Sequence, residues 1–123
     1  PPDEDFGYWA TPKNALTFGA MGVDGVHYVI LKVDGRITDN SPIISVDPSD
    51  TGHPYCLIGN NMANYLSVVC DVSDEKIKSL VKQEQNGNEV LIDFMIERCV
   101  HSRVYEHFSD NDIEKYVDLI ELK

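Results

Sequence analysis

Residues 26–35 have the sequence VHYVILKVDG, and this stretch decides the fold class of the chain. β-Branched and aromatic residues dominate positions 26–33, which is typical of a buried β-strand. Asp34-Gly35 follows at once, and this pair favours a type I′ turn because both residues tolerate a positive φ. The pattern therefore predicts a strand over 26–33 and a hairpin turn that sends a partner strand back over 36–39.

Shorter apolar runs extend the β pattern to both sides of this strand. Each run stops at a glycine or at aspartate-proline, residues that commonly end strands. The predicted strands are ALTF at 15–18, IISV at 43–46 and YCLI at 55–58. The residues expected to form the turns between them include Gly22, Asp24, Gly25 and Pro42.

After Gly59 the apolar residues recur at helical spacing. Helices are expected to begin at Asn60 or Asn61, at Asp71 or Ser73, at Glu89 and after Ser109. The third of these runs over 89–108, although its opening VLIDFMI would also suit a strand. Strands followed by helices indicate a single α+β domain over 1–123. We expect a largely antiparallel central sheet with helices packed on one face, and the start without methionine leaves room for a native segment before it.

The charge balance of the chain is unusual. It has 21 acidic and 10 basic side chains, a formal net charge of −11. Such a charge repels nucleic acid, whose binding needs lysine and arginine, and attracts basic proteins. Taken by itself, the acidity is explained more simply by solubility. No apolar run is long enough to span a membrane. The three cysteines, Cys56, Cys70 and Cys99, form no CxxC pair, so a reducing, cytoplasmic location is expected.

The search for catalytic chemistry finds no convincing site. His101 and His107 are six residues apart, which places them on different sides of a helix and disfavours a shared metal. The cysteines lie among apolar residues, where thiols are inert core fillers. His27 lies within the strongest strand, and we interpret it as a half-buried residue hydrogen-bonded to neighbouring backbone. The sequence therefore predicts no enzyme, no cofactor and no metal site.

Several short motifs in the first half of the chain resemble those of the SMI1/KNR4 (SUKH) superfamily. They are ALTFG at 15–19, GVDGVHY at 22–28, SPII at 41–44, VDP at 46–48, and LIG at 57–59 followed by Tyr65-Leu66. The resemblance implies an α+β fold in which Gly22, Asp24, Gly25 and Pro42 form turns. It also implies a binding function, because many bacterial members resemble immunity proteins that neutralise a toxin, often a nuclease. Eukaryotic relatives act as regulatory interaction proteins.

Charge and resemblance together predict an acidic immunity protein that binds a basic, nuclease-type toxin. An acidic surface would compete with phosphate for the basic groove of such a toxin. Each aspartate has the alternative role of an ordinary turn residue. A regulatory or scaffold domain of the same fold, and a small hydrolase or metal-dependent enzyme, remain alternative functions. The candidate contact residues are Asp24, Asp34, Asp39, Asp47, Asp50, His53 and Tyr55.

Overall fold

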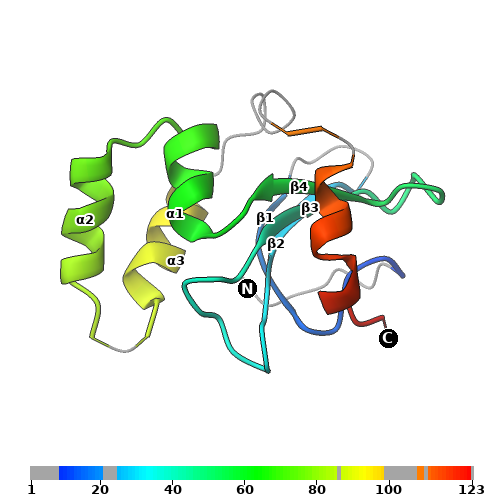
Figure 1. Cartoon of the computed structure of the whole chain (residues 1–123), viewed down its shortest axis with the longest axis horizontal. Coiled ribbons are helices and arrows are strands. Elements are labelled where there is room, and N and C mark those ends of the chain that lie inside the picture. Colours follow the sequence, from blue (N-terminus) through cyan, green and yellow to red (C-terminus); the bar gives the residue numbers. More distant parts are fainter. Residues whose placement is uncertain (1–8, 21–24, 86, 99–107, 110, 123) are drawn as a thin grey trace.

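The computed structural model describes residues 9–20, 25–85, 87–98, 108–109 and 111–122. In these ranges the chain forms a four-stranded sheet with the order β1-β2-β3-β4, and every neighbouring pair is antiparallel (Figure 1). The predicted α+β class and antiparallel sheet are confirmed. The strands are β1 (Ala15–Ala20), β2 (His27–Leu31), β3 (Ile43–Val46) and β4 (Tyr55–Gly59).

The predicted turn at Asp34-Gly35 is confirmed, but the strand predicted over 36–39 is wrong. Asp34 and Gly35 have φ values of 52° and 79°, and the residues on either side of them exchange backbone hydrogen bonds of 2.8 and 3.1 Å. Pairing ends after that single bridge. β2 already has β1 on one side and β3 on the other, so its backbone offers residues 36–39 no ladder to join.

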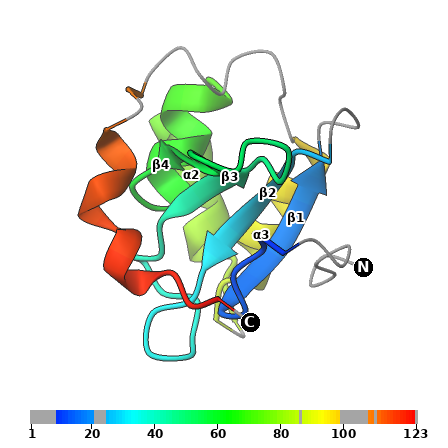
Figure 2. The same ribbon diagram turned by 90° about the vertical axis from the view of Figure 1, so that its right-hand side faces the viewer.

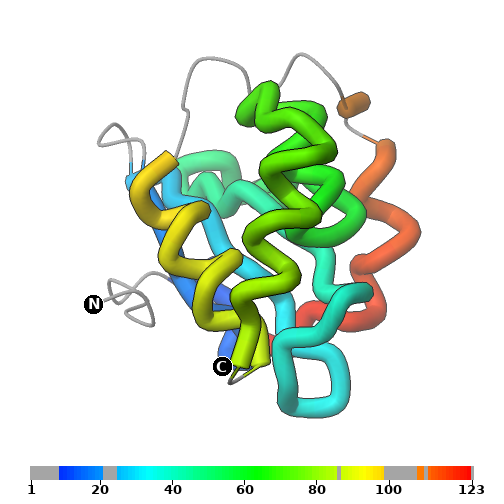
Figure 3. Tube along the Cα trace, turned by 90° about the vertical axis from the view of Figure 1, so that its left-hand side faces the viewer, coloured from blue at the N-terminus to red at the C-terminus, as the bar shows by residue number. Residues whose placement is uncertain are grey.

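Helices cover one face of the sheet, as Figure 3 shows for the green and yellow segments. They are α1 (Met62–Asn64), the π-helix η1 (Tyr65–Val69), α2 (Asp74–Lys82) and α3 (Glu89–Glu97). Two predicted N-caps are confirmed: Asn61 Oδ1 accepts from Asn64 N at 2.7 Å, and Ser73 Oγ accepts from Lys76 N at 3.2 Å. VLIDFMI is helical. The remainder of the third predicted helix, 99–107, lies outside the described residues.

The opposite face of the sheet is covered as well. Short 3₁₀-helices, η2 (Asp112–Lys115) and η3 (Val117–Leu119), stand where a final α-helix was expected. They lie beside β4 (Figure 2). Their apolar side chains pack against a second apolar cluster on this face of the sheet. The prediction that helices pack on one face of the sheet therefore holds for the α-helices but not for the C-terminal 3₁₀-helices. The strands explain this arrangement, because all residues of β2 and β3 are buried and so both faces need a cover.

His27 joins the N-terminal lead-in to the sheet. Its imidazole is fully buried, where the sequence suggested half burial, and the expected backbone hydrogen bond is present. Nδ1 donates to the carbonyl of Gly25 at 2.8 Å, and Nε2 lies 2.8 Å from Thr11 Oγ1. Because a carbonyl only accepts, Nδ1 carries the proton and Nε2 accepts from the threonine hydroxyl. Burial lowers the pKa of the His27 imidazole below its usual 6.5.

Candidate functional site

A cleft of about 610 Å³ opens at one end of the sheet, between the β3–β4 connection and the C-terminal 3₁₀-helices. We call it the β3–β4 cleft. Its volume falls within the range of about 300–1,000 Å³ that is usual for ligand-binding clefts. Its lining residues are Ser45, Asp47, Asp50, Gly52, His53, Pro54, Tyr55, Cys56, Asn111, Ile113, Glu114 and Val117.

The charged groups of this lining are all acidic. Asp47, Asp50 and Glu114 carry carboxylates, and the described lining includes no lysine or arginine. Asp47 Oδ1 accepts from the backbone N and the hydroxyl of Ser49, at 3.1 and 2.6 Å. Asp50 Oδ1 accepts from the backbone N of His53 at 3.0 Å. One oxygen of each aspartate therefore holds the loop, and no described residue donates to the other oxygen.

The rest of the lining combines apolar surface with two polar groups of the strands. Ile113 and Tyr55 are half-buried, whereas Val117 is 51% exposed. Tyr55 Oη donates to the carbonyl of Ala10 at 2.6 Å, and burial raises the pKa of this phenol above 10.0. Ser45 pairs with Cys56 across the strands. Ser45 is 1% exposed, and its hydroxyl makes no hydrogen bond to any residue in the described ranges.

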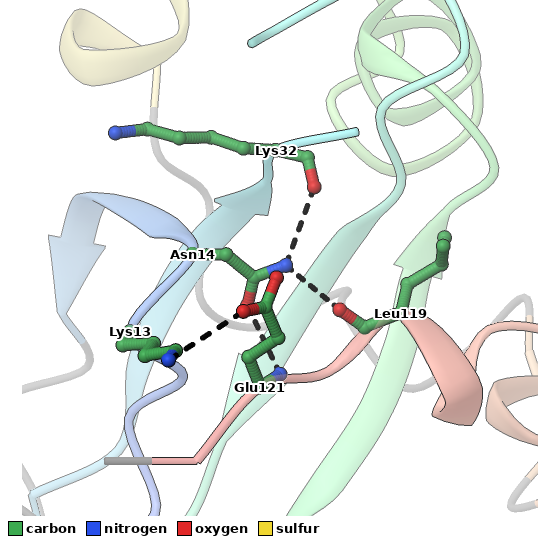
Figure 4. Close-up of polar contacts among 5 residues, drawn as sticks. All are labelled: Lys13, Asn14, Lys32, Leu119 and Glu121. Carbon is green, nitrogen blue, oxygen red and sulfur yellow. Dashed lines mark hydrogen bonds and ion pairs between the residues drawn. The ribbon is translucent and has the colours of Figure 1, made fainter. Parts of the chain in front are cut away.

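The C-terminal wall of the cleft is held to the sheet by Asn14 (Figure 4). Asn14 Nδ2 donates to the carbonyls of Leu119 and Lys32, at 2.7 and 3.3 Å. Asn14 Oδ1 accepts from the backbone N of Glu121 at 3.1 Å. At the other end of this wall, Tyr116 Oη donates to an asparagine side chain just after β4, at 2.8 Å. Since 3₁₀-helices this short have little stability of their own, these contacts position the wall.

The structure brings some of the predicted contact residues together and separates others. Asp47, Asp50, His53 and Tyr55 all line the cleft. Asp34 and Asp39 are exposed in the connection between β2 and β3, which lies at the opposite end of β3 from the β3–β4 connection. Their carboxylates therefore belong to a different part of the surface.

The predicted turn residues have mixed outcomes. Gly25 has φ 75°, a conformation that favours glycine, so its turn role is confirmed. Pro42 is buried directly before β3, and its carbonyl accepts from the N of Leu31 at 2.9 Å. Gly22 and Asp24 lie outside the described residues, and so do His101, His107 and Cys99.

Two residues that line the cleft, Ser45 and Glu114, were not singled out by sequence reasoning. Ser45 resembled any small strand residue, and Glu114 any acid on a helix, so neither carried a local signal. Trp9, at the start of the described residues, is 51% exposed. Its Nε1 donates to the carbonyl of Pro48 at 3.1 Å, which places the indole against the loop that carries Asp47.

The described residues contain no group of three or more histidine, cysteine, aspartate or glutamate side chains placed to hold a metal ion. None of their helices combines the length and apolar character that crossing a membrane requires. No family model, curated protein or solved structure matches the chain.

Proposed function

We propose that this chain is a binding module that recognises a basic protein at the β3–β4 cleft, as an immunity protein does when it neutralises a nuclease-type toxin. The composition of the cleft carries the proposal. Asp47, Asp50 and Glu114 line it without a lysine or arginine among the described lining residues. A protein that cleaves nucleic acid needs a basic groove, and an acidic cleft competes with phosphate for that groove.

Two further observations support this proposal. The net charge of −11 would steer a basic partner toward the chain over longer distances. The motifs at 15–19, 22–28 and 41–48 resemble the SMI1/KNR4 superfamily, which includes immunity proteins, and a meander sheet with helices is compatible with that family. The exposed Trp9 beside the acidic loop adds the kind of aromatic group that is enriched at the energetic centres of interfaces.

The test is capture of the partner by proteins that differ only in cleft charge. An extract of the source cells is passed over immobilised wild-type chain and over a variant carrying Asp47→Asn, Asp50→Asn and Glu114→Gln. Proteins held only by the wild type are purified, and their affinity is measured one at a time. A control variant with Asp34→Asn and Asp39→Asn tests loss of charge outside the cleft.

We expect a basic protein whose affinity falls at least about tenfold with the cleft variant, since one ion pair at 4 Å contributes about 1 kcal/mol even in water. The affinity should also fall when ionic strength rises from about 0.05 to about 0.3 M. The control variant should change it much less. If the captured partner is a nuclease, the wild-type chain should inhibit it. A partner that is not basic, or binding that ignores salt and cleft charge, would refute the proposal, as would the capture of nothing.

A further inference from the structure

A short segment before β1 covers part of the sheet face that carries the second apolar cluster. We call residues 9–12 the N-terminal strap. Ala10 is fully buried in that cluster, and Thr11 is 1% exposed. The strap belongs to no strand, and three hydrogen bonds that involve side chains tie it down. Its attachment can therefore open without breaking any strand pairing.

Two of these hydrogen bonds attach the strap beside the β3–β4 cleft. Trp9 Nε1 donates to the carbonyl of Pro48 at 3.1 Å, and Tyr55 Oη donates to the carbonyl of Ala10 at 2.6 Å. Pro48 belongs to the β3–β4 connection, and Tyr55 lines the cleft. Burial raises the pKa of the Tyr55 phenol, so it stays uncharged at neutral and mildly acidic pH. Release of the strap would free both groups from these contacts.

The third hydrogen bond ties the strap to a histidine. The His27 side chain lies on the same face of the sheet as Val29 and Leu31 of the second cluster, because side chains alternate along a strand. Its Nε2 accepts from Thr11 Oγ1 and its Nδ1 donates to the carbonyl of Gly25, both at 2.8 Å. Burial lowers the pKa of His27, so the docked strap favours the neutral imidazole. Protonation would turn Nε2 into a donor and place a charge beneath the strap.

The described surroundings of the imidazole offer little to neutralise such a charge. Its partners across the strands and at its two ring nitrogens are uncharged, namely Ala20, Val46, Thr11 and Gly25. On the β3 side Asp47 comes next, but its Oδ1 accepts from Ser49. Beyond the strap, Lys13 and Glu121 pair with each other at 3.7 Å. Asp24 lies outside the described residues. An imidazolium at this place therefore gains most from contact with water.

We propose that the N-terminal strap is a pH-sensitive device that lifts from the sheet when His27 is protonated. Lifting admits water to the imidazolium and releases Trp9 and Ala10 from their contacts beside the cleft. Opening the sheet instead would cost more, because β2 is paired on both sides. On acidification the strap therefore opens before the sheet does. This opening requires no partner, so its test is independent of the proposed function.

The direction of the pH dependence follows from the two states of the strap. In the lifted state the imidazole is solvated and has its usual pKa near 6.5, whereas burial in the docked state lowers that pKa. Acidification below pH 6.5 therefore favours the lifted state. The equilibrium constant for opening increases by at most about tenfold between pH 7.5 and 5.5.

Amide hydrogen exchange of the ¹⁵N-labelled full chain, followed by NMR at pH 7.5 and 5.5, measures this opening. Each rate is divided by the rate of an unstructured peptide at the same pH, so that the protection reports the opening equilibrium. We expect the protection of Ala10 and Thr11 to fall by about three- to tenfold on acidification. It should be lower than that of Val29 in β2 at both pH values. Urea at about 1 M should leave it unchanged, because lifting the strap exposes little surface.

Two variants test the trigger and the contact. His27→Gln cannot titrate, so the protection of the strap should be the same at both pH values. His53→Gln is the matched control, because His53 is exposed in the β3–β4 connection, and it should keep the pH dependence. Thr11→Val removes the hydroxyl at nearly constant shape. It should lower the protection of Ala10 about fivefold at pH 7.5, by loss of one hydrogen bond, and it tests the strap even if His27→Gln does not fold.

Several results would overturn the strap device. A change of less than about threefold at Ala10 and Thr11 between pH 7.5 and 5.5 would show that protonation does not open the strap. Persistence of the pH dependence in His27→Gln, or its loss in His53→Gln, would show that another group is the trigger. Protection of the strap as high as that of Val29 would show that it opens only together with the sheet. Unchanged protection in Thr11→Val would show that the hydroxyl contact does not hold it.

Discussion

Replacement of Asn14 by alanine should release the C-terminal wall of the β3–β4 cleft. The side chain makes three hydrogen bonds, with Lys32, Leu119 and Glu121, and alanine removes all of them. At about 1 kcal/mol net for each bond, the free energy of unfolding should fall by about 3 kcal/mol. With an m value near 2 kcal/mol/M, the urea midpoint should move down by about 1.5 M.

Urea unfolding followed by circular dichroism measures this change, and amide hydrogen exchange at Leu119 and Glu121 shows whether the wall opens locally. Asn14→Asp tests the two donated hydrogen bonds separately. It keeps the acceptor for Glu121 N but places a carboxylate oxygen against the carbonyls of Lys32 and Leu119. It should cost at least as much as alanine. Asn40→Ala is the control, since Asn40 is exposed and its side chain bonds to no described residue. Equal stability of Asn14→Ala and Asn40→Ala, with unchanged exchange, would refute the reasoning.

The remaining predictions concern the core and one helix cap. The pKa of His27 is lowered in the folded protein, so as pH falls the His27 imidazole is protonated in the unfolded chain before it is protonated in the folded one. This group should therefore leave the free energy of unfolding unchanged well above pH 6.5 and lower it below that pH, by at most about 1.4 kcal/mol per pH unit. Denaturation curves at several pH values measure this, and stability that rises on acidification from pH 7.5 to 5.5 would contradict it. Gly59→Ala should lower the free energy of unfolding by about 1–3 kcal/mol, because the added Cβ would lie 2.6 Å from Tyr65 Cβ. Gly52→Ala should lower it much less in the same urea assay, because the nearest atom to its added Cβ is 3.9 Å away. Ser73→Ala should cost about 1 kcal/mol by loss of the α2 cap, and an unchanged urea midpoint would count against that role.

Local sequence signals predicted the parts of the fold that local physics controls. Asp34-Gly35 forms the expected turn because few other residues accept a positive φ at both positions. Asn61 and Ser73 begin the helices because their side chains can satisfy N–H groups that the helix itself leaves unpaired. Apolar runs located four strands within one or two residues of their observed bounds.

The prediction failed where the result depends on distant segments. Residues 36–39 have the composition of a strand, but β2 is already paired on both sides. Val81 and Val117 follow the helical spacing of the apolar residues but are 50% and 51% exposed, because apolar spacing alone does not reveal which face a helix buries. The final segment became two 3₁₀-helices on the second face of the sheet, where its backbone is held by Asn14, more than 100 residues away in the chain.

The candidate site divides in the same way. The sequence by itself determined the acidity of the chain and the loop positions of Asp47, Asp50, His53 and Tyr55, because turn formation is a property of neighbouring residues. Only the tertiary structure decided that these residues share a cleft with Ser45 and Glu114, while Asp34 and Asp39 do not. A cleft forms where segments far apart in the chain pack together, and the free energy of that packing is a property of the whole fold.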